Sequence, residues 1–176
     1  MRLVKGFLFA VAGLFVIITL FSLLIPSKVL TAKSVTINAA PPQILSAIKD
    51  FKQWKKWHPV FVNDSAHLLI SNPSDKINTS LQWGIAGKKN IITLTEIFAE
   101  GIKFTLARTG ENTIENSIVI LPLPDSGSYQ VEWKALTKLK WYPWEKFAGI
   151  FVSEITGPGY DSALKSLKSY IENPVP

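Results

Sequence analysis

Few side chains in this chain of 176 residues could do acid–base chemistry near neutral pH. His58 stands directly after Trp57, and an imidazole beside an aromatic ring could act as a general base. Because no carboxylate or nucleophile accompanies it locally, the plainer interpretation is a polar residue that caps the carbonyl groups at a helix end before Pro59. We therefore predict no catalytic residue and keep His58 as a ligand contact.

The sequence carries no signature of a metal site or of a covalent catalytic centre. It has no cysteine, which excludes disulfides, thiolate catalysis and Cys-ligated zinc. The two histidines, His58 and His67, have no acidic partner at a helical offset, so no metal site is predicted. No stretch resembles a phosphate-binding loop or a serine elbow, and no cofactor is predicted.

Two charged residues in predicted strands could face a buried site. Strand alternation places Glu96 on the side of Ile92 and Leu94, and it places Arg108 on the side of Phe104. A buried charge costs several kcal/mol unless it is paired, so an inward pair of Glu96 and Arg108 would anchor a ligand headgroup. The alternative is that both charges lie at strand ends and reach water.

An α+β arrangement is predicted to position these residues. A strand at Val29–Ala39 and two short helices, Pro42–Asp50 and Lys52–Trp57, precede a region of period two at 65–140. Turn residues at regular intervals in that region predict about six antiparallel strands. A helical stripe then predicts a long carboxy-terminal helix, kinked or interrupted at Gly157–Gly159. That helix must cover the apolar face of the sheet.

Aromatic residues are predicted to gather between the sheet and this helix. Alternation and helical spacing point five of them inward: Trp83, Phe104, Trp133, Phe147 and Phe151. Trp57 shares a helix face with Trp54 and either packs into the core or forms one wall of a cavity. The rings would line a pocket or simply fill it, and the sequence leaves both interpretations open.

The amino terminus differs from the rest of the chain. Residues Gly6–Ile25 carry no charge, and a helix of that length spans roughly 30 Å, the thickness of a bilayer's hydrocarbon core. Arg2 and Lys5 precede it, which favours a cytoplasmic amino end and an extracytoplasmic body in a single-pass cell-membrane protein. A cleaved signal peptide and a buried helix are the alternatives. We predict an anchor at 1–26 and one domain at 27–176.

The chain has a net charge of +6. Four of its basic residues form a patch on the two predicted short helices: Lys49, Lys52, Lys55 and Lys56. Anionic lipid could attract this patch by roughly 1 kcal/mol per residue, although a solvated helix face is the other interpretation. Nucleic acid is not expected as a partner, because basic and acidic residues are mixed elsewhere and the body is placed outside the cytoplasm.

Three segments of the body resemble one family, in the order in which the family has them. Residues 34–42 resemble its first strand and the start of its first helix, 50–59 its second helix with two tryptophans before a polar residue and proline, and 157–168 the end of its last helix. This is the START-like superfamily, also called SRPBCC. The subgroup that the chain looks most like is the polyketide cyclase/dehydrase-like proteins, some of which begin with a membrane helix.

The resemblance implies a helix-grip fold, in which a curved antiparallel sheet of about seven strands wraps around the long carboxy-terminal helix. It also implies an apolar ligand held between sheet and helix. Few members share catalytic residues, so none is carried over to this chain.

Together these features favour a membrane-anchored domain that binds a hydrophobic small molecule or lipid without chemistry. A cyclase-like enzyme acting on a hydrophobic substrate and a protein-interaction module with a filled core are the alternatives. The expected ligand contacts are Trp57, His58, Trp83, Glu96, Phe104, Arg108, Trp133, Phe147 and Phe151. The membrane contact is expected through residues 6–25, and this anchor is expected to keep the mouth of the cavity near the bilayer.

Overall fold

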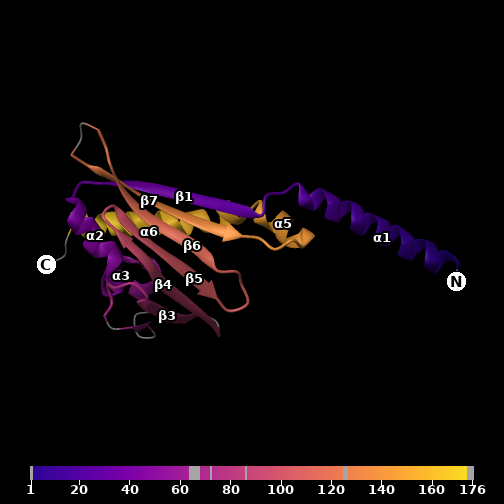
Figure 1. Cartoon of the computed structure of the whole chain (residues 1–176), viewed down its shortest axis with the longest axis horizontal. Helices are drawn as coiled ribbons and strands as arrows, with labels where there is room; N and C mark the ends of the chain where they lie inside the picture. The colour runs from indigo at the N-terminus through magenta and orange to yellow at the C-terminus, as the bar shows by residue number, and fades with distance from the viewer. Residues whose placement is uncertain (1, 64–67, 72, 86, 125–126, 174–176) are drawn as a thin grey trace.

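One open antiparallel sheet of seven strands forms the centre of the molecule, in the order β1-β7-β6-β5-β4-β3-β2 (Figure 1). The structure is a computed structural model that describes the chain apart from residues 1, 64–67, 72, 86, 125–126 and 174–176. The strands are β1 (Lys28–Ile37), β2 (Leu69–Ile70), β3 (Ser80–Ile85), β4 (Lys88–Phe98), β5 (Gly101–Arg108), β6 (Ile114–Pro122) and β7 (Tyr129–Lys138). The six strands predicted after the short helices are therefore confirmed.

Helices precede the sheet, connect its first two strands and follow its last strand. They are α1 (Arg2–Leu23), α2 (Pro41–Lys49), α3 (Phe51–Trp57), α4 (Pro59–Asn63), α5 (Pro143–Gly149) and α6 (Val152–Glu172). The sequence did not predict α4. Pro59 ends α3 as expected, but it also begins α4, because proline fits the first turn of a helix, where its missing N–H is not needed.

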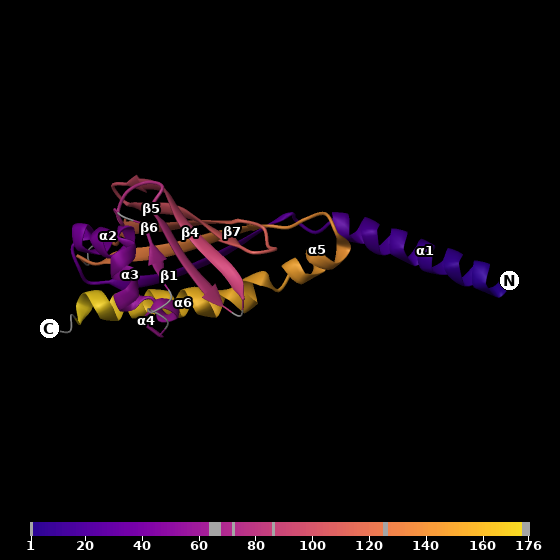
Figure 2. The same ribbon diagram turned by 90° about the horizontal axis from the view of Figure 1, so that it is seen from below.

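The long helix α6 packs against the sheet on the side of β1 and β7 (Figure 2). Its buried stripe follows helical spacing and consists of Ala163, Leu164, Leu167 and Ile171. β1 pairs with β7 along its whole length, from Lys28 opposite Lys138 to Ile37 opposite Tyr129. The first and last strands are thus neighbours, and the α+β helix-grip arrangement is confirmed.

The long helix is not interrupted at Gly157–Gly159, where the sequence predicted a kink or an interruption. α6 runs through Gly157–Gly159 with Pro158 inside it. The chain instead leaves regular helix at Ile150 and Phe151, between α5 and α6. A proline in the interior of a helix removes one backbone hydrogen bond, and here the buried stripe that follows it holds the helix together.

A cluster of aromatic rings fills the core between the sheet and the helices. Trp54 is fully buried, and its ring centroid lies 5.2 Å from Trp57, 5.4 Å from Phe104 and 5.9 Å from Trp133. Its indole N–H donates a hydrogen bond of 2.7 Å to the Ile48 carbonyl, so the ring is buried without an unsatisfied donor.

The amino-terminal helix α1 projects away from the sheet and is exposed along most of its length (Figure 2). Its most apolar window has a mean hydropathy of 2.5, so α1 is long and apolar enough to cross a membrane. A signal sequence meets the same criterion. α1 contacts α5, which lies at the carboxy-terminal end of α1, where Ser22 is buried (Figure 2).

Candidate functional site

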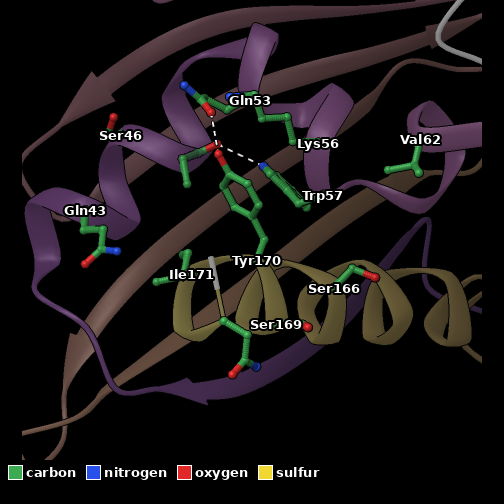
Figure 3. Close-up of a pocket in the computed structure, with 12 residues that line it drawn as sticks. Gln43, Ser46, Gln53, Lys56, Trp57, Val62, Ser166, Ser169, Tyr170 and Ile171 are labelled. Atoms are coloured by element: carbon green, nitrogen blue, oxygen red, sulfur yellow. Dashed lines mark hydrogen bonds between the residues drawn. The ribbon is translucent and has the colours of Figure 1, made fainter. Parts of the chain in front are cut away.

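A groove of about 820 Å³ lies between the helix pair α2–α3 and the carboxy-terminal part of α6 (Figure 3). Its apolar residues are Ala47, Trp57, Val62 and Ile171, and its uncharged polar residues include Gln43, Ser46, Gln53, Ser166, Ser169 and Asn173. The volume falls in the range of small-molecule sites, roughly 300–1,000 Å³. The groove can accept a ligand that has both an apolar and a polar part.

Trp57 forms the wall between the groove and the aromatic core. Its indole N–H donates to the Ala47 carbonyl at 3.1 Å, which fixes the ring beneath α2. Its ring also lies 5.2 Å from Trp54, because the two residues are three apart on α3 and share one face. Of the ligand contacts expected from the sequence, Trp57 is the one that this groove includes.

Two ionisable residues line the groove, Lys56 and Tyr170. The Tyr170 hydroxyl donates a hydrogen bond of 2.7 Å to the Gln53 side-chain oxygen, which joins α6 to α3 across the groove (Figure 3). Among the residues that the structure describes, those that line the groove include no carboxylate and no histidine. The described lining therefore has hydrogen-bond donors and acceptors that could orient a ligand.

His58 lies in the aromatic core beside the groove and is neutral near pH 7. Burial lowers the pKa of its imidazole from 6.5 to about 4. The ring stacks on Trp54 at 5.5 Å and on Phe61 at 4.5 Å. Its Nδ1 accepts a hydrogen bond from the Val60 N–H at 3.3 Å, so the side chain caps the start of α4 and not the end of α3.

Three predicted contacts, Trp83, Phe104 and Trp133, face inward as expected and are buried. They pack as core: Phe104 lies 5.7 Å from Trp133, and Trp83 lies 5.0 Å from Phe61. The indole N–H of Trp133 donates to Asn116 at 3.1 Å. Within the part of the chain that the structure describes, the buried indole N–H of Trp83 has no hydrogen-bond partner.

The prediction that Phe147 and Phe151 point between sheet and helix is wrong. Phe147 is 40% exposed and Phe151 is 54% exposed. Helical spacing identifies which residues share a face, but it does not say which side of the molecule that face meets. Phe147 lies in α5 and Phe151 lies in the break between α5 and α6, so both are outside the long buried stripe of α6.

Glu96 and Arg108 do not form the inward pair that alternation suggested. A β-bulge between Leu94 and Glu96 shifts the pleat by one residue, so the Glu96 carboxylate reaches the surface and pairs with Lys103 at 2.7 Å. Arg108 is partly exposed and pairs with Glu111 at 3.5 Å. The alternative interpretation, in which both charges reach water, is therefore the correct one.

Arg108 nevertheless lies close enough to Tyr160 on α6 for its charge to act on that side chain. Burial raises the pKa of the Tyr160 hydroxyl, and the positive charge of Arg108 opposes this shift. Tyr160 also packs on Trp133 at 5.2 Å, so it belongs to the edge of the aromatic core.

The basic patch on α2 and α3 follows the apolar segment in sequence but not in space. β1 separates them by ten residues in extended conformation, a distance of about 33 Å, and the patch lies at the end of the domain away from α1 (Figure 1). His67 is outside the described residues. No group of three or more metal-ligating side chains occurs among the residues that are described.

The polar residues of the groove were missed by the sequence analysis. The sequence pattern places these residues on the solvent-facing sides of helices: Gln43, Ser46 and Gln53 on the short helices, and Ser166 and Ser169 on the last one. Nothing local sets them apart from solvated residues. They become a site because α6 crosses next to α2 and α3, as the bond between Tyr170 and Gln53 shows.

A family model described as polyketide cyclase / dehydrase and lipid transport matches residues 28–172 of this chain. The chain belongs to the polyketide cyclase/dehydrase and lipid transport family. The match covers all seven strands and the helices α2 to α6, and it begins after α1. The resemblance to START-like proteins is thereby confirmed, and this family commonly binds hydrophobic ligands.

Solved structures share the family's fold at low identity. A START superfamily protein from Mycobacterium smegmatis is 18% identical with a TM-score of 0.60, over 83% of this chain and 99% of that one. Truncated norcoclaurine synthase from Thalictrum flavum is 14% identical with a TM-score of 0.61, over 84% and 96%.

A third similar structure is DynU16, from the dynemicin biosynthetic locus. It is 13% identical with a TM-score of 0.59 over 84% of this chain, which spans 48% of the longer DynU16 chain. Identities this low show that the fold is shared. No curated protein matches this family member.

Proposed function

We propose that this protein is a membrane-anchored binding domain for a hydrophobic small molecule or lipid, and that it binds its ligand without chemistry. The observation that carries the proposal is the groove of about 820 Å³ with Trp57 in its wall and uncharged polar residues around it. Its size suits a single small ligand, and the family to which the chain belongs supports an apolar one.

The lining favours an amphipathic ligand. An aliphatic or ring portion would lie on Trp57, Ala47 and Ile171, where burial contributes about 25 cal/mol per Å² of apolar surface. A hydroxyl, carbonyl or carboxylate would meet the polar side chains of α2, α3 and α6. Lys56 lies in the lining and favours a ligand whose polar end is acidic.

Binding fits this site better than catalysis does. An enzyme would need at least two inward polar groups around one site, and the three candidates are engaged separately: Glu96 with Lys103, Arg108 with Glu111, and His58 with the Val60 N–H. An imidazole with a pKa of about 4 is also too weak a base to take a proton efficiently near pH 7.

Anchoring by α1 would hold the groove away from the bilayer. α1 lies at one end of the domain, and α2 and α3, which contribute residues to the groove lining, lie at the other, separated by the length of β1 (Figure 2). The expectation that the anchor keeps the cavity mouth near the membrane is therefore replaced in our proposal. A ligand would enter the groove from the aqueous side or from another protein.

A groove-filling variant tests the binding proposal. Ser169→Phe places a ring in the groove, and Lys165→Phe, on an exposed residue outside the groove lining, is the matched control. The full chain and both variants are purified in a mild detergent, extracted with organic solvent and compared by mass spectrometry. We expect one species that is present in the parent and the Lys165→Phe variant and at least tenfold depleted in Ser169→Phe, equivalent to about 1.4 kcal/mol.

Lipids that surround α1 are retained by all three proteins and so do not mimic this result. Identical extracts from the three proteins would overturn the groove as the ligand site.

An interaction module is the second candidate, because the rings between sheet and helix pack on one another instead of lining a hollow. If the groove binds a protein, Ser169→Phe should abolish co-purification of that protein, and the lipid extracts of the three proteins should stay identical. The two candidates therefore give opposite results with the same pair of variants.

A further inference from the structure

An exposed apolar surface surrounds α5 and the first turn of α6. Its side chains are Trp141, Trp144, Phe147, Ile150, Phe151 and Ile155, whose exposed fractions run from 40% for Phe147 to 76% for Ile155. We call these six residues the α5 surface. Isolated exposed apolar residues are normal, whereas a group this dense in sequence marks contact with a membrane or a partner.

The α5 surface lies beside the carboxy-terminal end of α1 (Figures 1 and 2). Lys146 on α5 is buried, and its ammonium group donates to the Ile25 carbonyl at 2.9 Å and to the Ser27 hydroxyl at 2.5 Å. These bonds fasten α5 to the segment that leaves α1. The position of the α5 surface relative to α1 is thus set by direct contacts and not by a free linker.

The contact with the last turn of α1 fixes the depth at which the α5 surface would lie in a bilayer. α1 has 22 residues, which at about 1.5 Å per residue span roughly 33 Å, close to the hydrocarbon thickness. When α1 crosses the bilayer, its last turn reaches the boundary between acyl chains and headgroups. α5 packs against that turn, so the α5 surface lies at the same boundary.

The residue types of the α5 surface also suit this boundary. Tryptophan and tyrosine concentrate at membrane interfaces, because their rings are apolar and carry one polar atom. Trp141, Tyr142 and Trp144 form a continuous group of rings here, with adjacent centroids 5.0 Å apart. Glu154, which is exposed in the same stretch, would remain in the water of the headgroup region.

We propose that the α5 surface inserts into the interfacial region of the bilayer leaflet in which α1 ends, as a second membrane contact beside the anchor. This proposal rests on the proposed anchoring by α1. With two points of contact the domain would stand upright, with α2, α3 and the groove directed away from the lipid. A single flexible anchor would leave the orientation of the domain free.

Tryptophan quenching tests the proposal, because the six tryptophans divide cleanly by exposure. Trp54, Trp57, Trp83 and Trp133 are buried, whereas Trp141 and Trp144 are more than 60% exposed. The full chain is reconstituted into phosphatidylcholine vesicles with brominated acyl chains. We expect these lipids to quench about a third of the emission, since two of the six tryptophans lie at the interface.

The double variant Trp141→Phe/Trp144→Phe should lose this quenching, and Trp83→Phe, a change of a buried ring, should keep it. Alkaline carbonate extraction of the same vesicles separates this proposal from the anchoring on which it rests. Release of the chain by carbonate would overturn both.

Retention of the chain with unquenched tryptophans would overturn the α5 contact alone. Quenching that persists in the double variant would also overturn it, as would a dimer in which a second copy shields Trp144 from aqueous quenchers.

Discussion

The molecule contains two groups of aromatic residues that differ in what surrounds them. In the core, Trp54, Phe104 and Trp133 pack edge to face and are at most 4% exposed. Around α5, Trp141 and Trp144 are more than 60% exposed. The same residue types therefore stabilise the fold in one place and present an apolar surface in the other.

The difference follows from topology and not from composition. The core group comes from α3, β5 and β7, which meet in three dimensions although they are far apart in sequence. The α5 group comes from one short segment beside the end of α1. Aromatic content alone thus predicts neither a ligand cavity nor a membrane contact.

The largest expected effect separates the two groups by stability. Trp54→Ala removes a fully buried ring and the hydrogen bond to the Ile48 carbonyl, so we expect a loss of about 3–5 kcal/mol in the free energy of unfolding. Trp144→Ala, at an exposed residue, should change it by less than about 0.5 kcal/mol in mild detergent. Urea unfolding followed by circular dichroism measures both. Equal losses would mean that the two groups are not distinct.

A pH titration sharpens the comparison, because the core group holds His58 in its neutral form. The pKa of this imidazole is about 4 in the folded protein, against 6.5 when it is unperturbed, so the unfolded chain binds the proton more tightly. The contribution of the neutral imidazole to the free energy of unfolding is fully present above pH 6.5. It is lost as the pH falls towards 4, by a total on the order of 3 kcal/mol.

The variant His58→Asn can accept the hydrogen bond from the Val60 N–H but cannot titrate. The difference between parent and variant therefore isolates the imidazole from carboxylates that titrate in the same range. Parallel stability curves between pH 6.5 and 4 would show that His58 is not held neutral by the core.

The smallest expected effect concerns Glu96, which the sequence left either facing a buried site or reaching water and which the structure places at the surface. Glu96→Gln breaks the pair with Lys103, but both side chains are about half exposed, so the free energy of unfolding should change by less than about 0.5 kcal/mol. Urea unfolding at low and high salt measures it. A decrease of several kcal/mol in the free energy of unfolding would show that Glu96 is buried.

Regular strands were predicted well, and irregular positions were not. Trp83, Phe104 and Trp133 face inward as expected, because alternation holds over uninterrupted strands. The same rule failed at Glu96, where one extra residue in a β-bulge reverses the pleat. No residue type in that segment signals the bulge in advance.

The candidate site was predicted in part. Trp57 was expected as a wall residue, and it lines the groove. The polar residues around it were missed, because the groove exists only where Tyr170 of α6 reaches Gln53 of α3, 117 residues earlier. A contact over that distance leaves no periodic trace in either segment.

By itself, the sequence determined the apolar amino-terminal helix, the order of the strands, the two short helices after the first strand, the family and the absence of cysteine chemistry. These depend on backbone periodicity, residue type and length, which act over a few neighbouring residues. Only the tertiary structure decided that the core rings pack together, that the groove lies at the end remote from α1, and that Phe147 and Phe151 face outward. Those outcomes depend on which elements meet, and that is settled by contacts between distant parts of the chain.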